Sequence, residues 1–98
     1  MTLQLDLSPR AVGDLEDIWR FTAENWGRGK ADAYTGAIDA AMRGLLVNPF
    51  ATRERSEVTP PVRLRRCGSH FVIFRVVENR VSVLRIIHVK ANWRAVLS

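Results

Sequence analysis

Residues 62–88 read VRLRRCGSHFVIFRVVENRVSVLRIIH. β-Branched and aromatic side chains dominate this stretch, and Gly68-Ser69 and Asn79 are typical turn residues that divide it. The runs that remain are residues 62–67, 70–77 and 81–88. Runs of this length with such short connections predict three strands joined by hairpins.

The N-terminal end of the chain predicts a fourth strand and the start of a helix. Leu3, Leu5 and Leu7 alternate with polar residues, which is the period of a strand with one buried face. Ser8 can then accept a hydrogen bond from a backbone N–H of the first helical turn, and Pro9 loses no bond at the first helical position. A helix is therefore expected directly after this strand.

Two helices are predicted between the first strand and the three later ones. Apolar residues recur at helical spacing in residues 15–26 and 34–45, with glycines between the two groups and Asn48-Pro49 after the second. The short connection predicts an antiparallel helical hairpin. Residues 49–61 hold three prolines and predict a loop that crosses to the sheet.

The predicted order is strand, helix, helix, strand, strand, strand. A helical hairpin packed on one face of a mainly antiparallel four-stranded sheet is an α+β fold of two layers. A chain of 98 residues with 47% hydrophobic residues suits one domain and is too short for two separate cores. We therefore expect a single α+β domain over residues 1–98.

Composition and charge narrow the classes of function. Residues 1–50 carry five basic and seven acidic side chains, whereas residues 51–98 carry ten basic and three acidic ones. An Arg-rich half suits either a nucleic acid or an acidic protein. Cys67 is the only cysteine, so no internal disulfide, metal site or cofactor is expected. The chain shows no signal-peptide pattern and no long apolar run, which predicts a cytoplasmic location without membrane contact.

Strand alternation predicts two different faces for the sheet. If the hairpins keep even-numbered residues together, the face toward the helices holds Leu64, Val72, Phe74, Val76, Leu84 and Ile86. The opposite face then holds Arg63, Arg65, Phe71, Ile73, Arg75, Val77, Val83, Arg85 and Ile87. An open apolar face with interleaved arginines predicts a partner surface. The alternative is that residues Val89 to Ser98 fold back over this face.

Several short motifs, taken in order, resemble the ParE toxins of the RelE/ParE superfamily, which are also described as plasmid-stabilisation toxins. The resemblance covers nearly the whole chain. It rests on Leu7-Ser8-Pro9, Asp14-Leu15, Ile18-Trp19, Trp26-Gly27, Leu45 to Pro49, Val62-Arg63, Gly68-Ser69-His70 and Val83 to His88. One departure is Phe74-Arg75, because ParE proteins commonly place a Tyr between such a Phe and Arg.

The resemblance implies the RelE-like fold, with the first strand beside the last. It also implies a toxin of a type II toxin-antitoxin system that is neutralised by a ParD-like antitoxin and inhibits DNA gyrase by binding rather than as an enzyme. An acidic antitoxin tail would be complementary to the arginines of the open face. The predicted antitoxin-binding residues are Arg63, Arg65, Phe71, Ile73, Arg75, Val83 and Arg85.

An alternative is a ribosome-dependent endoribonuclease of the RelE type, which needs an acid and a base for proton transfer. His88 is its candidate catalytic group, although a lone His of core-facing parity is more often a structural residue. His70 lies at a turn, and Tyr34 lies on the apolar side of a helix. No catalytic residue is therefore assigned.

The C-terminal residues leave two interpretations open. Lys90, Trp93 and Arg94 could form an exposed tail that binds the target, whereas Trp93 alone could anchor the tail to the core. A third class of function, a basic nucleic-acid-binding module, ranks last because the sequence lacks the pattern of exposed stacking aromatics that such modules use. Direct binding to nucleic acid is therefore not expected.

Overall fold

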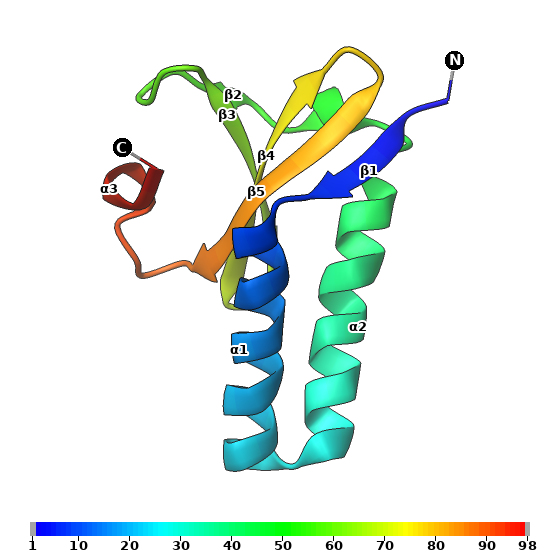
Figure 1. The fold of residues 1–98 in the computed structure, drawn as a ribbon, viewed down its shortest axis with the longest axis vertical. Coiled ribbons are helices and arrows are strands. Elements are labelled where there is room, and N and C mark those ends of the chain that lie inside the picture. The colour runs from blue at the N-terminus through cyan, green and yellow to red at the C-terminus, as the bar shows by residue number, and fades with distance from the viewer. Residues whose placement is uncertain (1, 98) are drawn as a thin grey trace.

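The structure is a computed structural model that describes residues 2–97. The sheet order is β1-β5-β4-β3-β2, with β1 parallel to β5 and every other pair antiparallel (Figure 1). The elements in chain order are β1 (Gln4–Leu7), α1 (Pro9–Trp26), α2 (Arg28–Gly44), the 3-10 helix η1 (Pro49–Ala51), β2 (Glu54–Arg55), β3 (Val62–Cys67), β4 (His70–Val77), β5 (Arg80–His88) and α3 (Trp93–Leu97).

The predicted α+β architecture is confirmed, including the helical hairpin on one face and β1 beside β5. Two elements were not predicted. The two-residue strand β2 lies inside the expected loop and pairs with the start of β3, which makes the sheet five-stranded rather than four-stranded. The short helix α3 follows β5 and lies across the other face of the sheet.

The start of α1 forms as the sequence predicts. The Ser8 side chain accepts a hydrogen bond from the Ala11 N–H at 3.0 Å, and Pro9 occupies the first turn. Gly27 ends the helix with φ of +90°, a backbone conformation that favours glycine, and α2 begins at the next residue. A one-residue link of this kind holds α1 and α2 antiparallel.

Ser8, which caps α1, and Asp14 of α1 form hydrogen bonds with the edge of β5 beyond the last residue that pairs with β1. β1 pairs with β5 as far as Val83, and the Ser8 hydroxyl then donates to the Leu84 carbonyl at 2.6 Å. The Asp14 carboxylate accepts from the Ile86 N–H at 2.8 Å. These two contacts satisfy edge groups that an unpaired strand would leave open.

The main core lies between the helical hairpin and the sheet. Its side chains come from one face of each helix and from the facing side of β4 and β5, and burial of these apolar groups is the main source of stability. Its buried members are Ala11, Ile18, Ile38, Met42, Leu45, Val72, Phe74, Val81, Val83 and Ile86.

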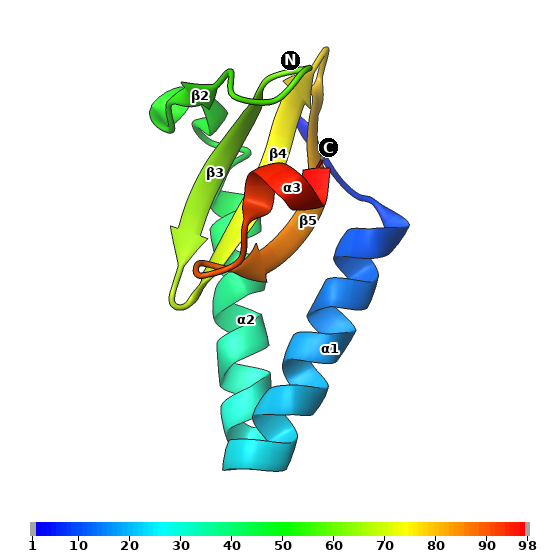
Figure 2. The ribbon, with the colours of Figure 1, turned by 90° about the vertical axis from the view of Figure 1, so that its left-hand side faces the viewer.

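A second, smaller core lies on the other face, under α3 (Figure 2). Val62, Ile73 and Ile87 form its floor, and Trp93 of α3, only 9% exposed, closes it. Phe71 and Leu84 pack at its margin. The alternative in which the C-terminal residues fold back over this face is therefore what the structure shows for residues up to Leu97.

The predicted sheet register was wrong in β3. Arg63 is paired with Phe74, Leu64 with Ile73 and Arg65 with Val72, so the arginines share the helix-facing side with Phe74 and Val72. Leu64 instead joins the second core. The hairpin between β3 and β4 turns at Gly68-Ser69 so that Cys67 pairs with His70, which shifts β3 by one residue from the assumed register.

An irregularity in β5 accounts for the second error. Ile73 pairs with Arg85, but the next residue, Phe74, pairs with Val83, so Leu84 is an extra residue on β5. Val83 therefore faces the helices and Leu84 faces α3, the reverse of the simple alternation.

Candidate functional site

The predicted antitoxin-binding residues do not form one open face. Ile73 and Val83 are fully buried, in the second and the main core respectively. Phe71 is half-buried beside α3. Three of the four arginines have partners within the chain. Arg65 is the exposed member of the set.

The three partnered arginines each bond another segment of the same chain. Arg63 lies over the Phe50 ring and donates to the Thr52 carbonyl. Arg75 donates to the Pro60 and Pro61 carbonyls at 3.1 and 3.3 Å. Arg85 forms a bidentate ion pair with Asp14. Within residues 2–97 Arg65 makes no ion pair, so its charge is available to a partner.

The free edge of β3 adjoins Arg65. β2 pairs with β3 only at Val62 and Arg63, so within the described chain no strand covers the edge from Leu64 to Cys67. An exposed strand edge offers backbone donors and acceptors to an extended segment of another chain. Arg65 and this edge therefore form a surface that suits an extended acidic partner.

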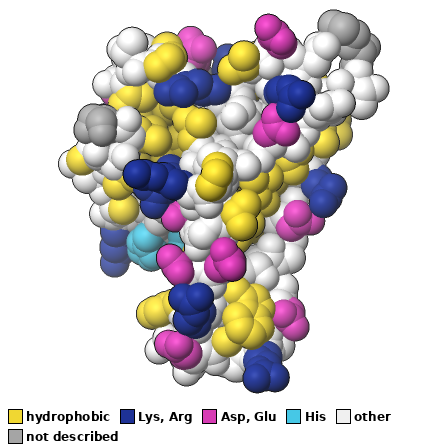
Figure 3. Space-filling model, viewed as in Figure 1, with side chains coloured by type: hydrophobic (Ala, Val, Ile, Leu, Met, Phe, Trp, Pro, Cys, Tyr) yellow, Lys and Arg dark blue, Asp and Glu magenta, His cyan; other side chains and the backbone are white. Residues whose placement is uncertain are grey.

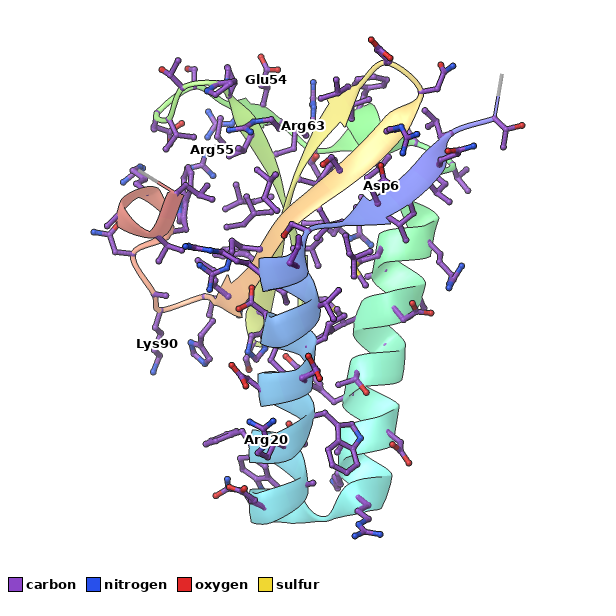
Figure 4. All side chains as sticks on the ribbon, viewed as in Figure 1. Asp6, Arg20, Glu54, Arg55, Arg63 and Lys90 are labelled. Carbon is purple, nitrogen blue, oxygen red and sulfur yellow. The ribbon has the colours of Figure 1, made fainter. Side chains whose placement is uncertain are left out.

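The residues predicted to bind the target are divided by the structure. Trp93 is buried in the second core, which confirms the interpretation of Trp93 as an anchor. Arg94 donates to Glu57 at 3.0 Å and also lies 5.2 Å from the Trp93 ring centroid. Lys90 is exposed in the segment between β5 and α3, away from Arg55 and Arg63 (Figure 4).

Glu57 joins the loop before β3 to α3. Arg55 donates to its carboxylate at 2.8 Å and Arg94 at 3.0 Å, and Arg55 also lies over the Trp93 ring. The hydrogen bonds from Arg55 and then Arg94 lower the pKa of Glu57 from 4.5 to about 2. The position of α3 over the second core therefore depends on a charged carboxylate.

His70 and His88 lie side by side in the structure, although no local sequence pattern grouped them. They are paired across β4 and β5, and their ring centroids lie 5.4 Å apart. The Tyr34 hydroxyl of α2 lies 2.6 Å from His70 Nδ1, and the Lys90 N–H donates to His88 Nδ1 at 3.1 Å. Burial, and then the neighbouring His88, lower the pKa of His70, so this imidazole is neutral at pH 7.

A recess of about 340 Å³ opens beside these histidines, between the helical hairpin and the β3–β4 turn. In Figure 3 histidine surface is visible where the sheet meets the helices. The exposed rings of Phe21 and Trp26 form part of its wall, in edge-to-face contact with centroids 5.9 Å apart. Its lining side chains, here called the histidine recess, are Phe21, Thr22, Trp26, Lys30, Tyr34, Ser69, His70 and His88.

The sequence pattern did not group Phe21 with Trp26, which the structure places in contact and leaves exposed. Phe21 and Trp26 stand five residues apart, a spacing that helical periodicity places only roughly on one side of α1. No local pattern predicted the contact of Gly68 and Ser69 with Tyr34 of α2. Within residues 2–97 no group of three or more metal-binding side chains occurs. The same residues include no helix with the length and hydrophobicity needed to cross a membrane.

Comparison with known proteins identifies the family of this chain. Residues 5–93 match the family described as ParE toxin of type II toxin-antitoxin system, parDE. The chain belongs to the ParE toxin family. It is therefore a toxin component of a type II toxin-antitoxin system, as its motifs suggested.

Named members of the ParE family are similar over most of their length. Toxin ParE1 of Mycobacterium tuberculosis strain H37Rv is 35% identical over 83 residues, which cover 84% of this chain and 85% of the relative. Toxin ParE1 of Caulobacter vibrioides is 33% identical over 89 residues, which cover 91% and 92%. These matches extend over most of this chain.

A solved structure shares the ParE fold. A chain from a structure described as the chromosomal ParDE TA system from P. aeruginosa superposes with a TM-score of 0.80, covering 91% of this chain and 98% of that one. Its sequence identity is 23%, so this likeness shows the fold alone. The arrangement of the sheet and the helical hairpin is therefore shared by the two chains.

Proposed function

We propose that this ParE toxin acts by binding DNA gyrase in the cytoplasm, and that a ParD-like antitoxin neutralises it. The observation that carries the proposal is the family match over residues 5–93, which includes both long helices, β2 to β5 and all of β1 except Gln4. The solved relative is described as part of a ParDE system. Both partners of this chain, antitoxin and target, are inferred on that basis.

The antitoxin contact is best placed at the free edge of β3. Arg65 is exposed there without an ion pair in residues 2–97, and unpaired backbone groups of β3 can bond an extended segment. A carboxylate opposite Arg65 would give a charge-assisted hydrogen bond. Ile73 and Val83, being fully buried, are removed from the predicted contact set, whereas Phe71 keeps a half-exposed ring.

A gyrase inhibitor needs no proton transfer, and the residues predicted to bind the target now reduce to a surface near Lys90. Lys90 is exposed, while Trp93 and Arg94 serve to hold α3 in place. The target surface would therefore consist of Lys90 and the outer side of α3.

RNA cleavage is the second candidate, and one observation favours it. The imidazoles of His70 and His88 lie side by side with a tyrosine hydroxyl on one of them, which is the kind of grouping that an acid and a base require. Against it, the Nδ1 atom of each ring already has a partner in the chain.

One experiment separates the two candidates. Purified toxin and its His88→Gln variant are compared in a gyrase supercoiling assay and in a ribosome-dependent RNA cleavage assay. A gyrase inhibitor should block supercoiling in both forms and cleave no RNA. A nuclease that uses His88 should cleave RNA and lose about 10² to 10⁴ of its rate in the variant. RNA cleavage by the parent without inhibition of gyrase would reject the proposal.

A further inference from the structure

The histidine recess is lined by one cation and several hydrogen-bonding groups as well as by aromatic rings. Within the lining of the recess there is no carboxylate, whereas Lys30 brings an ammonium group from the first turn of α2. His70 and His88 each have Nδ1 in a hydrogen bond within the chain. The Lys30 ammonium therefore gives this lining a positive charge that favours an anion.

The partner of His88 fixes its tautomer. The Lys90 N–H donates to His88 Nδ1 at 3.1 Å, so this nitrogen is an acceptor. An imidazole whose Nδ1 accepts carries its hydrogen on Nε2. His88 therefore keeps an Nε2–H donor that this bond does not use. The Tyr34 oxygen accepts from the Ser69 N–H at 3.0 Å and lies 2.6 Å from His70 Nδ1, so His70 is held in place beside it.

The aromatic part of the lining is exposed. Phe21 and Trp26 are 59% and 61% exposed, so both rings keep most of their surface in contact with water. Their contact is edge-to-face, with 65° between the ring planes, and at least one ring face stays free. An exposed aromatic pair beside a set of donors fits a flat apolar ring that carries an anionic group.

We propose that the histidine recess binds a nucleoside monophosphate, with the base stacked on Trp26 and Phe21 and the phosphate near Lys30, His70 and His88. A phosphate presents three strong acceptor oxygens to the Lys30 ammonium and the His88 Nε2–H, whereas a carboxylate presents two. Base-to-aromatic stacking tolerates any base, because every base has a π-face. The recess volume of about 340 Å³ lies within the range of small-ligand sites.

This nucleotide binding is separate from toxicity and requires neither gyrase nor an antitoxin. The nucleotide can be free, or it can be one unit of a single-stranded nucleic acid. Both sources present the same base and phosphate to the recess, so they are separated by experiment.

The test is isothermal titration calorimetry of the full chain with adenosine 5′-monophosphate. Adenosine, inorganic phosphate and N-acetylphenylalanine are titrated in parallel, so that the base, the anion and an aromatic carboxylate are each measured alone. The nucleotide should bind more tightly than any of the three, by about tenfold or more, because only it offers both a base to the aromatic rings and a phosphate to Lys30.

Two exposed positions provide the variants. Trp26→Ala removes the stacking surface and Lys30→Gln removes the ammonium, and neither side chain is buried. Each should weaken nucleotide binding by about tenfold. The controls are Phe50→Ala, an aromatic ring of similar exposure outside the recess, and Arg43→Gln, a cation at the far end of α2. Both controls should bind the nucleotide as the parent does, and circular dichroism checks that all four variants fold.

Other results would overturn the proposal. These are undetectable binding of the nucleotide at millimolar concentration, binding no tighter than phosphate, stronger binding of N-acetylphenylalanine, or equal binding by the parent and both variants. A six-residue single-stranded oligoadenylate then identifies the source. Tighter binding of the oligomer that still requires Trp26 and Lys30 assigns the site to single strands, and equal or weaker binding assigns it to the free nucleotide.

Discussion

Asp14 of α1 holds Arg85 of β5 in a two-pronged ion pair across 71 residues of chain, with oxygen-to-nitrogen distances of 2.8 and 2.9 Å. The same carboxylate accepts from the Ile86 N–H, so one side chain joins the helix to both the side chain and the backbone of the strand. Alternation had placed Arg85 on a surface for a partner. The raised pKa of Arg85, due chiefly to its hydrogen bond with Asp14, agrees with a structural role.

Asp14→Ala should destabilise the fold strongly. Removing one member of a well-shielded ion pair leaves the other charge without its partner, and such losses are about 3 to 5 kcal/mol when the pair is fully buried. Because the Arg85 and Asp14 side chains keep 22% and 14% exposure, we expect about 2 to 3 kcal/mol in urea unfolding. The control is Asp17→Ala, which breaks an exposed ion pair with Arg20 and should cost under about 0.5 kcal/mol. Equal losses of unfolding free energy in the two variants would show that the Asp14–Arg85 pair stabilises the fold no more than an exposed ion pair does.

Gly68→Ala should destabilise the protein and disturb the histidine recess. Gly68 has φ of +58°, and an added Cβ would lie 2.7 Å from Tyr34 Cε1. The left-handed backbone alone costs an alanine about 1 to 2 kcal/mol, before the ring has to move. The measurements are the melting temperature and the NMR signals of the His70 ring.

The matched control for that change is Gly36→Ala, in the middle of α2. Nothing lies within 4 Å of a Cβ at this position, and its backbone is helical. Alanine should therefore raise stability by about 0.5 to 1 kcal/mol. If Gly68→Ala cost no more than the backbone term of about 1 to 2 kcal/mol and left the His70 ring signals unchanged, the close approach of Gly68 to Tyr34 would be of no consequence.

Acid should loosen α3 before it unfolds the rest of the chain. Because the folded-state pKa of Glu57 is lowered from 4.5 to about 2, its contribution to stability is complete above pH 4.5 and is lost as the pH falls toward 2. We expect the indole N–H signal of Trp93 to shift across this window. Glu57→Gln should show the shifted signal already at pH 5.5, whereas Glu54→Gln, at an exposed neighbouring position, should match the parent. A Trp93 signal that is the same in all three proteins would show that Glu57 does not hold α3.

Arg65→Glu should weaken binding of the ParD-like antitoxin and reduce its dependence on salt. The charge reversal places a carboxylate at the free edge of β3, where the proposed partner is acidic. Calorimetric titration of the antitoxin at low and high salt measures both effects. Arg28→Glu, also exposed but at the tip of the helical hairpin, is the control and should bind normally. Unchanged affinity and salt dependence for Arg65→Glu would move the antitoxin contact elsewhere.

Local patterns predicted the elements of this fold better than the faces they present. Ser8 and Pro9 marked the start of α1, and the apolar spacing of Ile38, Met42 and Leu45 marked the buried face of α2, because both signals depend on near neighbours. The register of β3 depends instead on the geometry of one turn, and a shift of one residue exchanges the two faces.

The candidate sites were harder to predict for the same reason. Arg63, Arg75 and Arg85 looked free because their partners, a loop carbonyl, two proline carbonyls and Asp14, are distant in sequence. The histidine recess was not predicted because its lining comes from α1, α2, the β3–β4 turn, the start of β4 and the end of β5, which are distant in sequence. By contrast, the anchoring role of Trp93 was among the interpretations that the sequence allowed, since a tryptophan can anchor the segment that carries it by packing in the core.

Because of the extra residue at Leu84, the side-chain alternation of β5 changes parity within the strand. Before it, the odd-numbered Val81 and Val83 enter the main core; after it, the even-numbered Ile86 does, and the odd-numbered Ile87 packs under α3. A polar side chain that is accepted at an even-numbered position before the bulge, such as Ser82, would therefore be unfavourable at Ile86 after it. The pattern of buried and exposed residues along this strand has to be read with a change of parity at Leu84.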